Sequence, residues 1–335
     1  GFARVLRLEH AALRAQSVDV SHGASAMLAS LPLPTAEAEM AWSGSMQFAA
    51  RLRACTAFAE PRNALARGLN AITGGLGGLG LRAAAMLFEG GATAVVLSSR
   101  SGQVARDGPS LEVLFGAAVR LNASDVGDPA DALSLLTDAV LVGVLHAAGV
   151  LRDRMLRSMA IGDVDAVFAP KALAASHVQR TLTPKPLEAL GLFSSIASTF
   201  GNVGQANYAA ANAYLDSCAL CRRRLGTLGS SLQISAVSGA GMGATTFHKD
   251  QLDAMGAVSL NEFAVFLYMS LAPARAAVER AHAICARVIL GSMATGALSE
   301  LVQLPRKAAS VIAAAAGSAL AQSLVQLEPS HRRTH

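Results

Sequence analysis

The 335-residue sequence is poor in lysine, in aromatic residues and in charge overall. Charged residues make up 15% of the chain and aromatic residues 4%, and the formal net charge is +5. Most of the basic residues are scattered arginines, and the four lysines are Lys171, Lys185, Lys249 and Lys307. Nucleic-acid binders combine a clustered basic surface with aromatic side chains for stacking. The composition therefore excludes nucleic acid as the expected partner.

Cysteine is also scarce, with four residues, which is too few for a scaffold built on disulfides. Cys218 and Cys221 form a C-x-x-C, but no second pair stands at zinc-site spacing, so we expect packed helix residues. The first residues carry neither a methionine nor a secretory signal, which suggests a piece of a longer cytoplasmic protein. The alanine-rich run 308–323 falls short of the ~20 apolar residues that a membrane span needs. We expect no membrane span.

Short apolar runs alternate with helical patterns from residue 69 onward. This alternation predicts an α/β fold: a Rossmann-type doubly wound parallel sheet with helices on both faces. Ligands of such sheets bind beyond the carboxyl ends of the strands. The expected strands are 69–73, 94–97, 118–121, 141–145, 190–194 and 232–237, and the expected helices are 79–89, 129–139, 163–180 and 206–224.

The two ends of the chain do not follow this alternation. Residues 5–9, 17–20 and 46–52 have strand-like patterns, and Pro32 and Pro34 indicate a linker. We interpret residues 1–60 as the remnant of a separate unit or as an edge of the main sheet. Residues 239–258, glycine-rich and then polar, suggest a lid, and the part beyond 293 lacks strand character and suggests a helical or linker tail.

A glycine-rich segment, TGGLGGLG, lies directly between the first expected strand and the first expected helix. Glycine permits positive φ and lets the backbone approach a pyrophosphate, and the helix N-terminus offers free N–H groups to the anion. This context favours a dinucleotide site over a flexible loop without a ligand. The residues assigned to this loop are Thr73, Gly74, Gly75, Leu76, Gly77, Gly78, Leu79 and Gly80.

Further cofactor-binding candidates follow the next strands. Arg100 stands where NAD-binding folds usually place an acidic residue, and its guanidinium suits the 2′-phosphate of NADPH, although a solvated surface arginine is the alternative. Asp125 follows the third strand and is suited to accept from the adenine amine. At the fourth, small residues let the cofactor pass, and for His146 a structural role is favoured over catalysis. The residues assigned at these strand ends are Ser99, Arg100, Asp125, Val126, His146, Ala147, Ala148 and Gly149.

The catalytic candidates are Ser195, Tyr208, Asn212 and Lys171. Ser195 ends a strand, thirteen positions before Tyr208, and Asn212 shares a helix face with Tyr208 because the two are four apart. A tyrosine beside a serine hydroxyl can protonate a ketone oxygen if its pKa falls below the usual ~10. We expect the ammonium of Lys171 to lower the pKa of Tyr208.

Together these motifs resemble the ketoreductase domain of a modular type I polyketide synthase, a member of the short-chain dehydrogenase/reductase superfamily. The resemblance rests on TGGLGGLG, SSRSG, HAAGV and SSIAS…GQANYAAANAYLD, and on a lysine placed before the serine strand with an asparagine four after the tyrosine. It implies that residues 1–60 are the C-terminal part of the family's structural subdomain. Residues 61–292 would be the catalytic NADP-binding domain, and 293–335 the tail.

The resemblance implies NADPH-dependent reduction of a β-ketoacyl thioester, carried by phosphopantetheine on an acyl carrier protein, in polyketide or fatty-acid biosynthesis among neighbouring synthase domains. Tyr208 would protonate the oxygen, Ser195 would hydrogen-bond it, Lys171 would tune Tyr208 and hold ribose, and Asn212 would position Lys171 or a water. The resemblance also implies that Lys171 and Tyr208 bind the cofactor. Asp153 after HAAGV, and Phe200 where A-type members carry tryptophan, resemble the B-type. The alternatives are an inactive scaffold domain and a free-standing reductase.

Three departures from the family pattern bear on activity, while every catalytic group is retained. The segment 101–124 is shorter than the family's helix-bearing stretch, and the motif N-W-G-x-W is replaced by the residues 235–239, SAVSG. The front of the structural subdomain is also missing. We expect the shorter segment to leave the surface that packs on the adenine incomplete. We expect the replaced motif to change the contacts of the cofactor and of the lid.

Overall fold

The computed structural model describes residues 1–20, 37–43, 46–55, 67–104, 114, 116–137, 140–183, 186–242, 248, 250, 252, 257–271, 282–285 and 324–332. Pro32, Pro34 and the run 308–323 lie outside these residues, as does most of the expected lid. No helix in the described part is long and apolar enough to cross a membrane.

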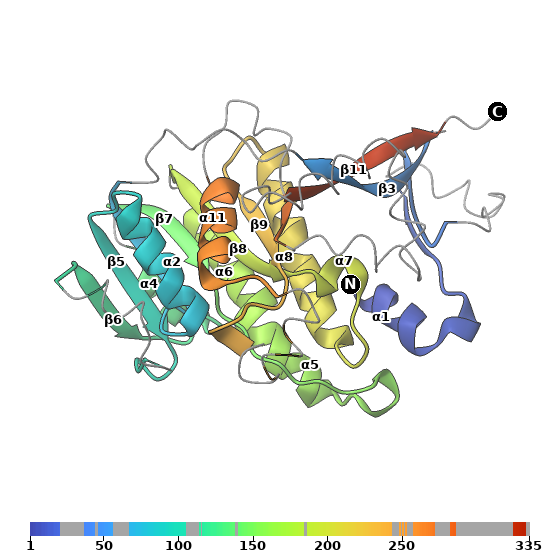
Figure 1. Cartoon of the computed structure of the whole chain (residues 1–335), viewed down its shortest axis with the longest axis horizontal. Helices are drawn as coiled ribbons and strands as arrows, with labels where there is room; N and C mark the ends of the chain where they lie inside the picture. The colour runs from blue at the N-terminus through green and yellow to red at the C-terminus, as the bar shows by residue number, and fades with distance from the viewer. Residues whose placement is uncertain are drawn as a thin grey trace.

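A parallel sheet forms the centre of the molecule (Figure 1). Its strands are β4 (Leu69–Thr73), β5 (Ala94–Ser99), β6 (Val119–Ala123), β7 (Leu141–His146), β8 (Ala189–Ser195), β9 (Ser230–Ile234) and β10 (His282–Cys285). Their spatial order, β6-β5-β4-β7-β8-β9-β10, reverses direction between β4 and β7, as in a doubly wound Rossmann sheet. The predicted fold class is confirmed.

Helices cover both faces of this sheet (Figure 1). One face carries α2 (Gly78–Glu89) and α11 (Leu260–Leu271), and the other carries α4 (Pro129–Leu136), α6 (Ala174–Leu182) and α8 (Ala206–Arg224). Successive strand residues serve opposite faces, so Leu145 packs under α2 and α11 while Val144 packs under α4 and α6. Burial on both faces explains why the central strands are continuous apolar runs.

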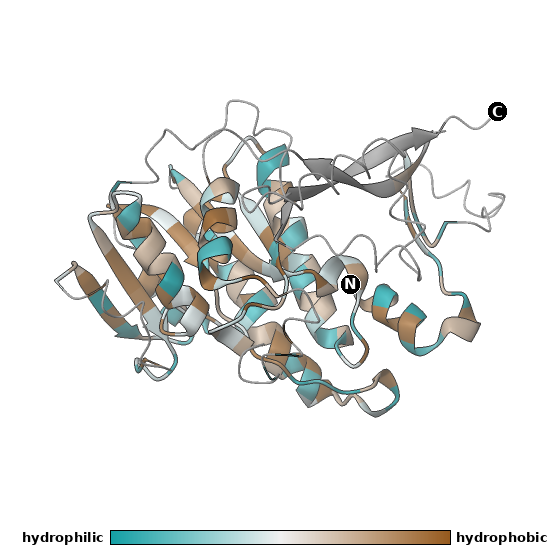
Figure 2. Cartoon of the chain, viewed as in Figure 1, coloured by the Kyte–Doolittle hydropathy of each residue, from teal (hydrophilic) through white to brown (hydrophobic). Residues whose placement is uncertain are grey.

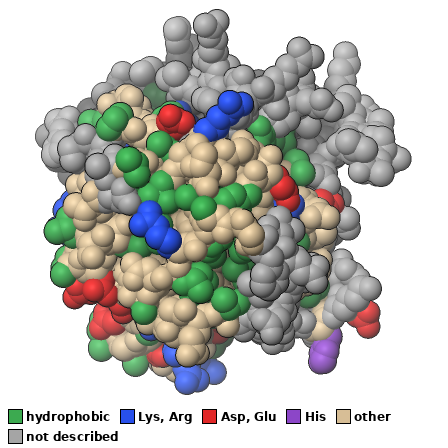
Figure 3. Space-filling model, turned by 90° about the vertical axis from the view of Figure 1, so that its left-hand side faces the viewer, with side chains coloured by type: hydrophobic (Ala, Val, Ile, Leu, Met, Phe, Trp, Pro, Cys, Tyr) green, Lys and Arg blue, Asp and Glu red, His purple; other side chains and the backbone are tan. Residues whose placement is uncertain are grey.

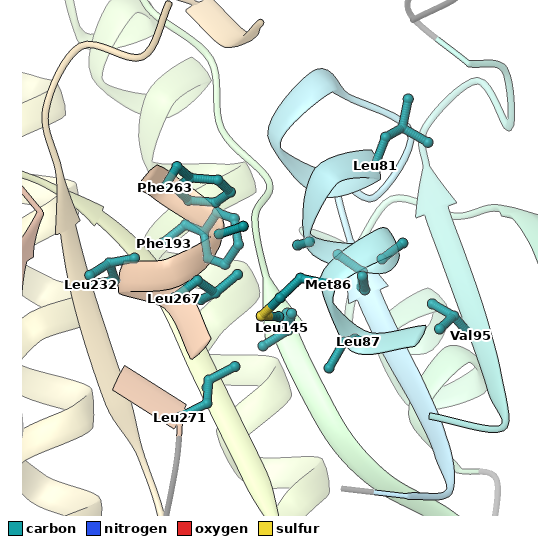
Figure 4. Close-up of a cluster of buried hydrophobic side chains, with 14 of the residues drawn as sticks. Leu81, Met86, Leu87, Val95, Leu145, Phe193, Leu232, Phe263, Leu267 and Leu271 are labelled. Carbon is teal, nitrogen blue, oxygen red and sulfur yellow. The ribbon is translucent and has the colours of Figure 1, made fainter. Parts of the chain in front are cut away.

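The core under α2 and α11 fixes the strands that carry the site (Figure 4). Phe193 of β8 meets Phe263 of α11 edge to face, with ring centroids 5.6 Å apart. Met86 and Leu87 of α2 fill the neighbouring space beside Leu145. Figure 2 shows this distribution as apolar central strands beneath helices whose outer faces are more polar. The face turned toward the viewer in Figure 3 bears scattered basic side chains rather than a continuous basic field.

The front of the chain joins the same sheet. The strands β1 (Ser17–Val20), β2 (Glu39–Ser43) and β3 (Met46–Cys55) continue it through β11 (Leu324–Arg332), which pairs antiparallel with β3 and β10. Residues 17–20 and 46–52 are strands as expected. The expectation that no strand lies beyond residue 293 is wrong for 324–332, because pairing with β3 stabilises this segment and local pattern does not reveal a distant partner.

The expectation of a strand at residues 5–9 is also wrong, since α1 (Phe2–Glu9) is helical. Val5 is buried against Ala206, Tyr208 and Ala209 of α8, while Arg4 and Arg7 on other positions of the helix bind Glu39 of β2. Packing on a helix and ion pairing across to β2 therefore decide the conformation of this short segment.

The expected helix 163–180 is two helices separated by a wider turn. The helix α5 (Ile161–Phe168) leads into the π-helical turn η4 (Ala169–Leu173), and α6 follows. Proline at position 170 has no N–H to donate, which favours a departure from the regular α pattern here. Isolated π turns occur often at functional sites. The C-x-x-C lies on α8 and Cys218 is buried, as expected, but Cys221 is exposed and the expectation of packing is wrong for it, because a residue three positions along the helix is turned partly around its axis and lies on a different part of its surface.

Candidate active site

The glycine-rich loop connects β4 to α2 with the geometry of an anion site. Gly74 has a φ of +67°, a left-handed conformation that favours glycine, and Gly75 N–H donates to the Ser98 carbonyl at 2.9 Å. The residue before α2 is Gly77, which provides no side-chain cap, so the first N–H groups of the helix stay available. These groups and the positive end of the helix dipole suit a pyrophosphate.

Close backbone approach explains two of the loop's glycines. A Cβ at Gly74 would lie 2.6 Å from the backbone of Ala148, and one at Gly80 would lie 2.6 Å from Cα of Gly75. Thr73 also binds the segment after β7, because Ala147 N–H donates to its carbonyl at 2.9 Å. The loop thus packs between α2 and residues 147–149. The sequence assigns both the loop and residues 147–149 to the cofactor site. Leu76 is buried in the core beneath.

The candidates for the adenosine end stand at the carboxyl ends of β5 and β6. Arg100 is exposed directly after β5, and the Ser99 carbonyl accepts from the Ser124 backbone at 3.0 Å, which joins the two strand ends. Asp125 is exposed, and its Oδ1 accepts from Gly127 N–H at 3.0 Å. Val126 is buried. The side-chain hydroxyl oxygens of Ser98 and Ser124 are buried here without a hydrogen-bond partner among the described residues.

His146 links the phosphate loop to the turn that carries Lys171. The ring is fully buried, with Nδ1 2.6 Å from Thr73 Oγ1 and Nε2 3.1 Å from the Lys171 carbonyl. Since a carbonyl oxygen only accepts, Nε2 carries the hydrogen and Nδ1 accepts from the Thr73 hydroxyl. Burial, with the charge of Lys171, lowers the pKa of His146 to about 4, so the ring is neutral. These contacts agree with the structural role expected for His146.

Lys171 is the buried cation of the site. Its Nζ donates to the Phe193 carbonyl of β8 at 2.9 Å and lies 5.3 Å from the centroid of the Tyr208 ring. Gly149 makes room for it, because a Cβ there would lie 2.7 Å from Lys171 Cε. Burial lowers the pKa of Lys171 to about 7, and the charge of Asp216 acts in the opposite direction. The π turn directs this side chain inward between β8 and α8.

Ser195 and Asn212 lie on either side of Tyr208. Ser195 ends β8 and Tyr208 lies in the first turn of α8, and the side chains of Ser195 and Asn212 both act on the phenol in the direction that lowers its pKa. Asn212 Nδ2 also donates to the Tyr208 carbonyl at 2.8 Å, and its Oδ1 is buried with no partner in the described part of the chain. The structure therefore brings together all four sequence-predicted catalytic residues.

The expected effect of Lys171 on Tyr208 is wrong for this structure. Burial raises the pKa of Tyr208, and the neighbouring side chains of Asn212 and Ser195 only oppose that shift. The reason is that the Lys171 ammonium and the Tyr208 phenol are buried next to each other. Burial disfavours the charged form of each, and the Lys171 ammonium is turned to the Phe193 carbonyl. Tyr208 is accordingly held as the neutral phenol, which is the form that can give a proton.

Two residues were assigned to stereocontrol. Asp153 is exposed and its Oδ2 accepts from Gln205 Nε2 at 2.9 Å. Because Gln205 directly precedes α8 and lies three residues before Tyr208, Asp153 lies beside the N-terminus of this helix. Its charge contributes to the raised pKa of Tyr208. Phe200 is half-buried at the end of the short helix α7 (Ala197–Phe200) and does not belong to the cluster of described side chains packed around Tyr208.

The segment that replaces N-W-G-x-W lies against the phosphate loop. Val237 forms a parallel bridge with Val258, and Ser238 N–H donates to the Val258 carbonyl at 2.8 Å. A Cβ at Gly78 would lie 2.6 Å from Cβ of Ala240, which follows directly. The start of the expected lid, at Ala240, therefore packs directly against the phosphate loop.

Three polar residues that the sequence analysis did not assign also build the site. Asn207 is buried and donates to the carbonyls of Arg152 and Asp163, both at 3.0 Å, which holds α8 against the segment after β7. Glu9 of α1 accepts from the backbones of Leu156 and Gly204 at 2.7 and 2.8 Å. The third is Asp216, which follows Tyr208 by eight residues on α8. This spacing, visible in the sequence, places both residues on the same face of the helix. Within the described residues no cluster of metal-ligating side chains occurs.

The sheet order, the glycine loop and the lysine–tyrosine–serine group define a dinucleotide-binding oxidoreductase fold of the short-chain dehydrogenase/reductase type. The family model described as KR domain matches residues 68–239, just over half of the chain. The chain belongs to this family of polyketide synthase ketoreductase domains. Membership implies reduction of a keto group with a nicotinamide cofactor.

Curated relatives are large synthases. The chain is 35% identical to a 6-methylsalicylic acid synthase of Arthrobotrys oligospora over 220 residues, which is 60% of this chain and 12% of that protein. It is 34% identical to the spectinabilin polyketide synthase system protein NorB of Streptomyces orinoci over 277 residues, 78% of this chain and 13% of that protein. The chain thus spans about an eighth of the length of these relatives.

Solved structures agree with the family. The structure of an A1-type ketoreductase matches 95% of this chain and 69% of that chain with a TM-score of 0.76 and 28% identity. A structure of A-type ketoreductases from a modular polyketide synthase matches 85% of this chain and 62% of that chain, with a TM-score of 0.72 and 29% identity.

The residues present fit a nicotinamide dinucleotide. The uncapped α2 and the glycine loop suit the pyrophosphate. Three buried polar atoms have no partner among the described residues and could bind the cofactor: Asn212 Oδ1 on α8, and the hydroxyls of Ser98 and Ser124 at the ends of β5 and β6. These strand ends surround the switch point between β4 and β7, where dinucleotides bind in this class of sheet.

Proposed function

We propose that this chain reduces the β-keto group of an acyl thioester, carried on an acyl carrier protein, to the β-hydroxyl with NADPH. The observation that carries the proposal is the convergence of Tyr208, Ser195 and Lys171 at the carboxyl end of β8. The phosphate loop lies on the other side of the switch point, which suits a nicotinamide delivered beside this group.

Tyr208 acts as the general acid. NADPH would supply the hydride for the carbonyl carbon when bound. Tyr208 would give its proton to the carbonyl oxygen as the new C–H bond forms. Ser195 donates a hydrogen bond to the same oxygen and stabilises the developing negative charge. The raised pKa of Tyr208 supports its role, because it keeps the phenol protonated until the alkoxide, a stronger base, develops.

Lys171 supplies positive charge to the phenolate that remains. Its ammonium stands 5.3 Å from the Tyr208 ring centroid in a buried place, where charge interactions are stronger than in water. From there it also has the reach to hold a ribose hydroxyl of the cofactor. Asn212, four residues after Tyr208, positions Lys171 or a water through its Oδ1, which has no partner among the described residues. The site then returns to its starting state when Tyr208 regains a proton.

NADPH is proposed over NADH because of Arg100. The side chain is exposed at the end of β5, where NAD-binding folds usually place a carboxylate for the ribose hydroxyls. A guanidinium there pairs with a 2′-phosphate through a charge-assisted fork. Asp125, at the end of the neighbouring strand, would accept from the adenine amine.

B-type stereochemistry is proposed from Asp153. Its hydrogen bond to Gln205 fixes the carboxylate beside the start of α8, so it borders the side from which an acyl chain reaches Tyr208. Phe200 stands where A-type members carry tryptophan. We further assign residues 1–60 to a structural subdomain, 61–292 to the catalytic domain and 293–335 to a C-terminal tail that returns to the sheet as β11. We place this chain within a synthase whose neighbouring domains supply the carrier protein.

A reduction assay tests the function. The protein is mixed with NADPH and a β-ketoacyl N-acetylcysteamine thioester, and NADPH oxidation and the chirality of the alcohol are measured. We expect turnover with a B-type product. Tyr208→Phe should lower kcat by about 10²-fold or more while NADPH binding is retained.

Tyr214→Phe is the matched control, because Tyr214 lies on the same helix with 40% of its surface exposed. It should keep full activity. NADPH binding by the parent protein without any turnover would instead indicate an inactive scaffold domain. An A-type alcohol would refute the role given to Asp153.

A further inference from the structure

A buried carboxylate lies behind the catalytic group. Asp216 of α8 is buried and accepts three side-chain hydrogen bonds, from Ser198 at 2.6 Å, Ser231 at 2.5 Å and Gln233 at 2.8 Å. All three donors are neutral. The carboxylate is thus fully engaged but has no direct ion-pair partner among the described residues.

The network around Asp216 connects the elements that carry the catalytic residues. Asp216 follows Tyr208 by eight positions and Asn212 by four, so the three share one face of α8. Ser198 lies three residues after Ser195, and its hydroxyl is also 2.8 Å from the Ser195 carbonyl. On the other side, Gln233 of β9 accepts from Thr199 at 2.7 Å. One side chain therefore holds α8, α7 and β9 together.

A neutral amide would satisfy most of this network without a buried charge. Burying a carboxylate costs several kcal/mol unless hydrogen bonds and nearby cations compensate. The cation that benefits is Lys171. Its buried Nζ lies 5.3 Å from the ring centroid of Tyr208, which shares a face of α8 with Asp216, and it donates to the Phe193 carbonyl. The negative charge of Asp216 is the one that stabilises the ammonium of Lys171 against burial.

The other ionisable groups around this pair are few in the described part of the chain. From α1, Arg4 donates to the Ser198 carbonyl. From β7, His146 is held neutral by burial and by the charge of Lys171. Tyr208 of α8 is kept as the phenol. None of these supplies negative charge to Lys171.

We propose that Asp216 is a positioning residue of the active site: its buried charge keeps Lys171 an ammonium, and its hydrogen bonds hold the segment after Ser195 against α8. The inference rests on the proposed function, since Lys171 is assigned there the task of stabilising the Tyr208 phenolate. It predicts that the charge of Asp216, and not only its shape, determines the pH range of reduction.

The direction of the effect follows from charge. Lys171 must be protonated to act, and burial has lowered its pKa to about 7, so activity falls as the pH rises through that range. Removing the negative charge of Asp216 disfavours the ammonium further. The alkaline limb of the pH–rate profile therefore moves to lower pH in Asp216→Asn, and we expect a shift of about one pH unit because a buried charge is lost. At a pH above both limbs this is about a tenfold loss of rate.

The experiment compares kcat/KM between pH 5.5 and 9 for the parent, Asp216→Asn and the double variant Asp216→Asn/Gln233→Glu. The double variant moves the carboxylate across one hydrogen bond, from position 216 on α8 to position 233 on β9. The new amide donates to the new carboxylate, which still accepts from Thr199, and Ser198 turns its hydroxyl to the Ser195 carbonyl. We expect the alkaline limb of the double variant to return at least halfway to that of the parent. Thermal melts show whether each variant is folded.

The outcomes separate a charge effect from a structural one. If Asp216→Asn lowers the rate by one factor at every pH, or if the double variant fails to restore the limb while remaining folded, the proposal is overturned. An unfolded single variant leaves the double variant to decide, through its limb relative to the parent. If the parent protein shows no reduction at any pH, the proposed function fails, which is a different result from an active parent with an unmoved limb.

Discussion

His146 makes the stability of this fold depend on pH, and His146→Gln isolates that dependence. In the neutral ring Nε2 donates to the Lys171 carbonyl and Nδ1 accepts from the Thr73 hydroxyl. A glutamine reproduces the pair, with Nε2 as donor and Oε1 as acceptor about the same distance apart, but it does not take up a proton. The variant therefore keeps the link between the phosphate loop and the π turn and removes only the titration.

The magnitude follows from the folded-state pKa of about 4, against an ordinary value of 6.5. Below pH 6.5 the unfolded chain binds a proton at His146 and the folded chain does not. Stability is therefore fully present above pH 6.5 and is lost as the pH falls toward 4, by ~1.4 kcal/mol per unit of pH. Between pH 7 and pH 5 the loss due to His146 amounts to about 2 kcal/mol.

The assay is urea unfolding followed by circular dichroism at pH 7, 6 and 5. We expect the parent to lose about 2 kcal/mol more than His146→Gln over this interval. His10→Gln serves as control, because His10 is exposed and should leave the parent's pH dependence unchanged. Equal losses in the parent and in His146→Gln would refute the buried neutral histidine. A strongly unstable His146→Gln at pH 7 would refute the claim that glutamine reproduces the two hydrogen bonds.

Two further predictions concern the cofactor side of the site. Gly80→Ala should destabilise the protein by about 1–3 kcal/mol in thermal or urea unfolding, because its Cβ would press on the backbone of Gly75, whereas Gly77→Ala, whose Cβ meets no atom closer than 3.5 Å, should be nearly neutral. Equal losses in both would show that the close approach is not what requires glycine. Arg100→Ala should weaken NADPH binding by about tenfold or more and leave NADH binding nearly unchanged, as measured by fluorescence titration. Similar losses for both cofactors would remove the basis for NADPH specificity.

The parallel sheet and the positions of the motifs could be predicted from the sequence because their signals are local. The strand–glycine–helix sequence around Thr73 is contained in adjacent residues, and the predicted bounds of α8, 206–224, agree with the structure. The meeting of Lys171, Ser195 and Tyr208 could be predicted only through the resemblance to ketoreductases. Nothing in the spacing of Lys171 indicates that it lies beside Phe193 and Tyr208.

What the sequence did not reveal depends on distant partners. Residues 2–9 form a helix because Val5 packs on α8 and Arg4 and Arg7 reach Glu39, and residues 324–332 form a strand because β3 lies beside them. The raised pKa of Tyr208 has the same origin. The sequence indicates which charges are nearby, but burial of the phenol follows only from the assembled core.

The π turn at 169–173 sets a limit on how this helix can vary in length. It contains one residue more than a regular α-helix would need at that place, so α5 and α6 are out of step by a single position. Deleting one residue there would let a straight helix form, but it would also swing whatever follows by about 100° around the axis. Lys171 would then leave the side of β8. A shorter, more regular helix is thus incompatible with an ammonium beside the tyrosine.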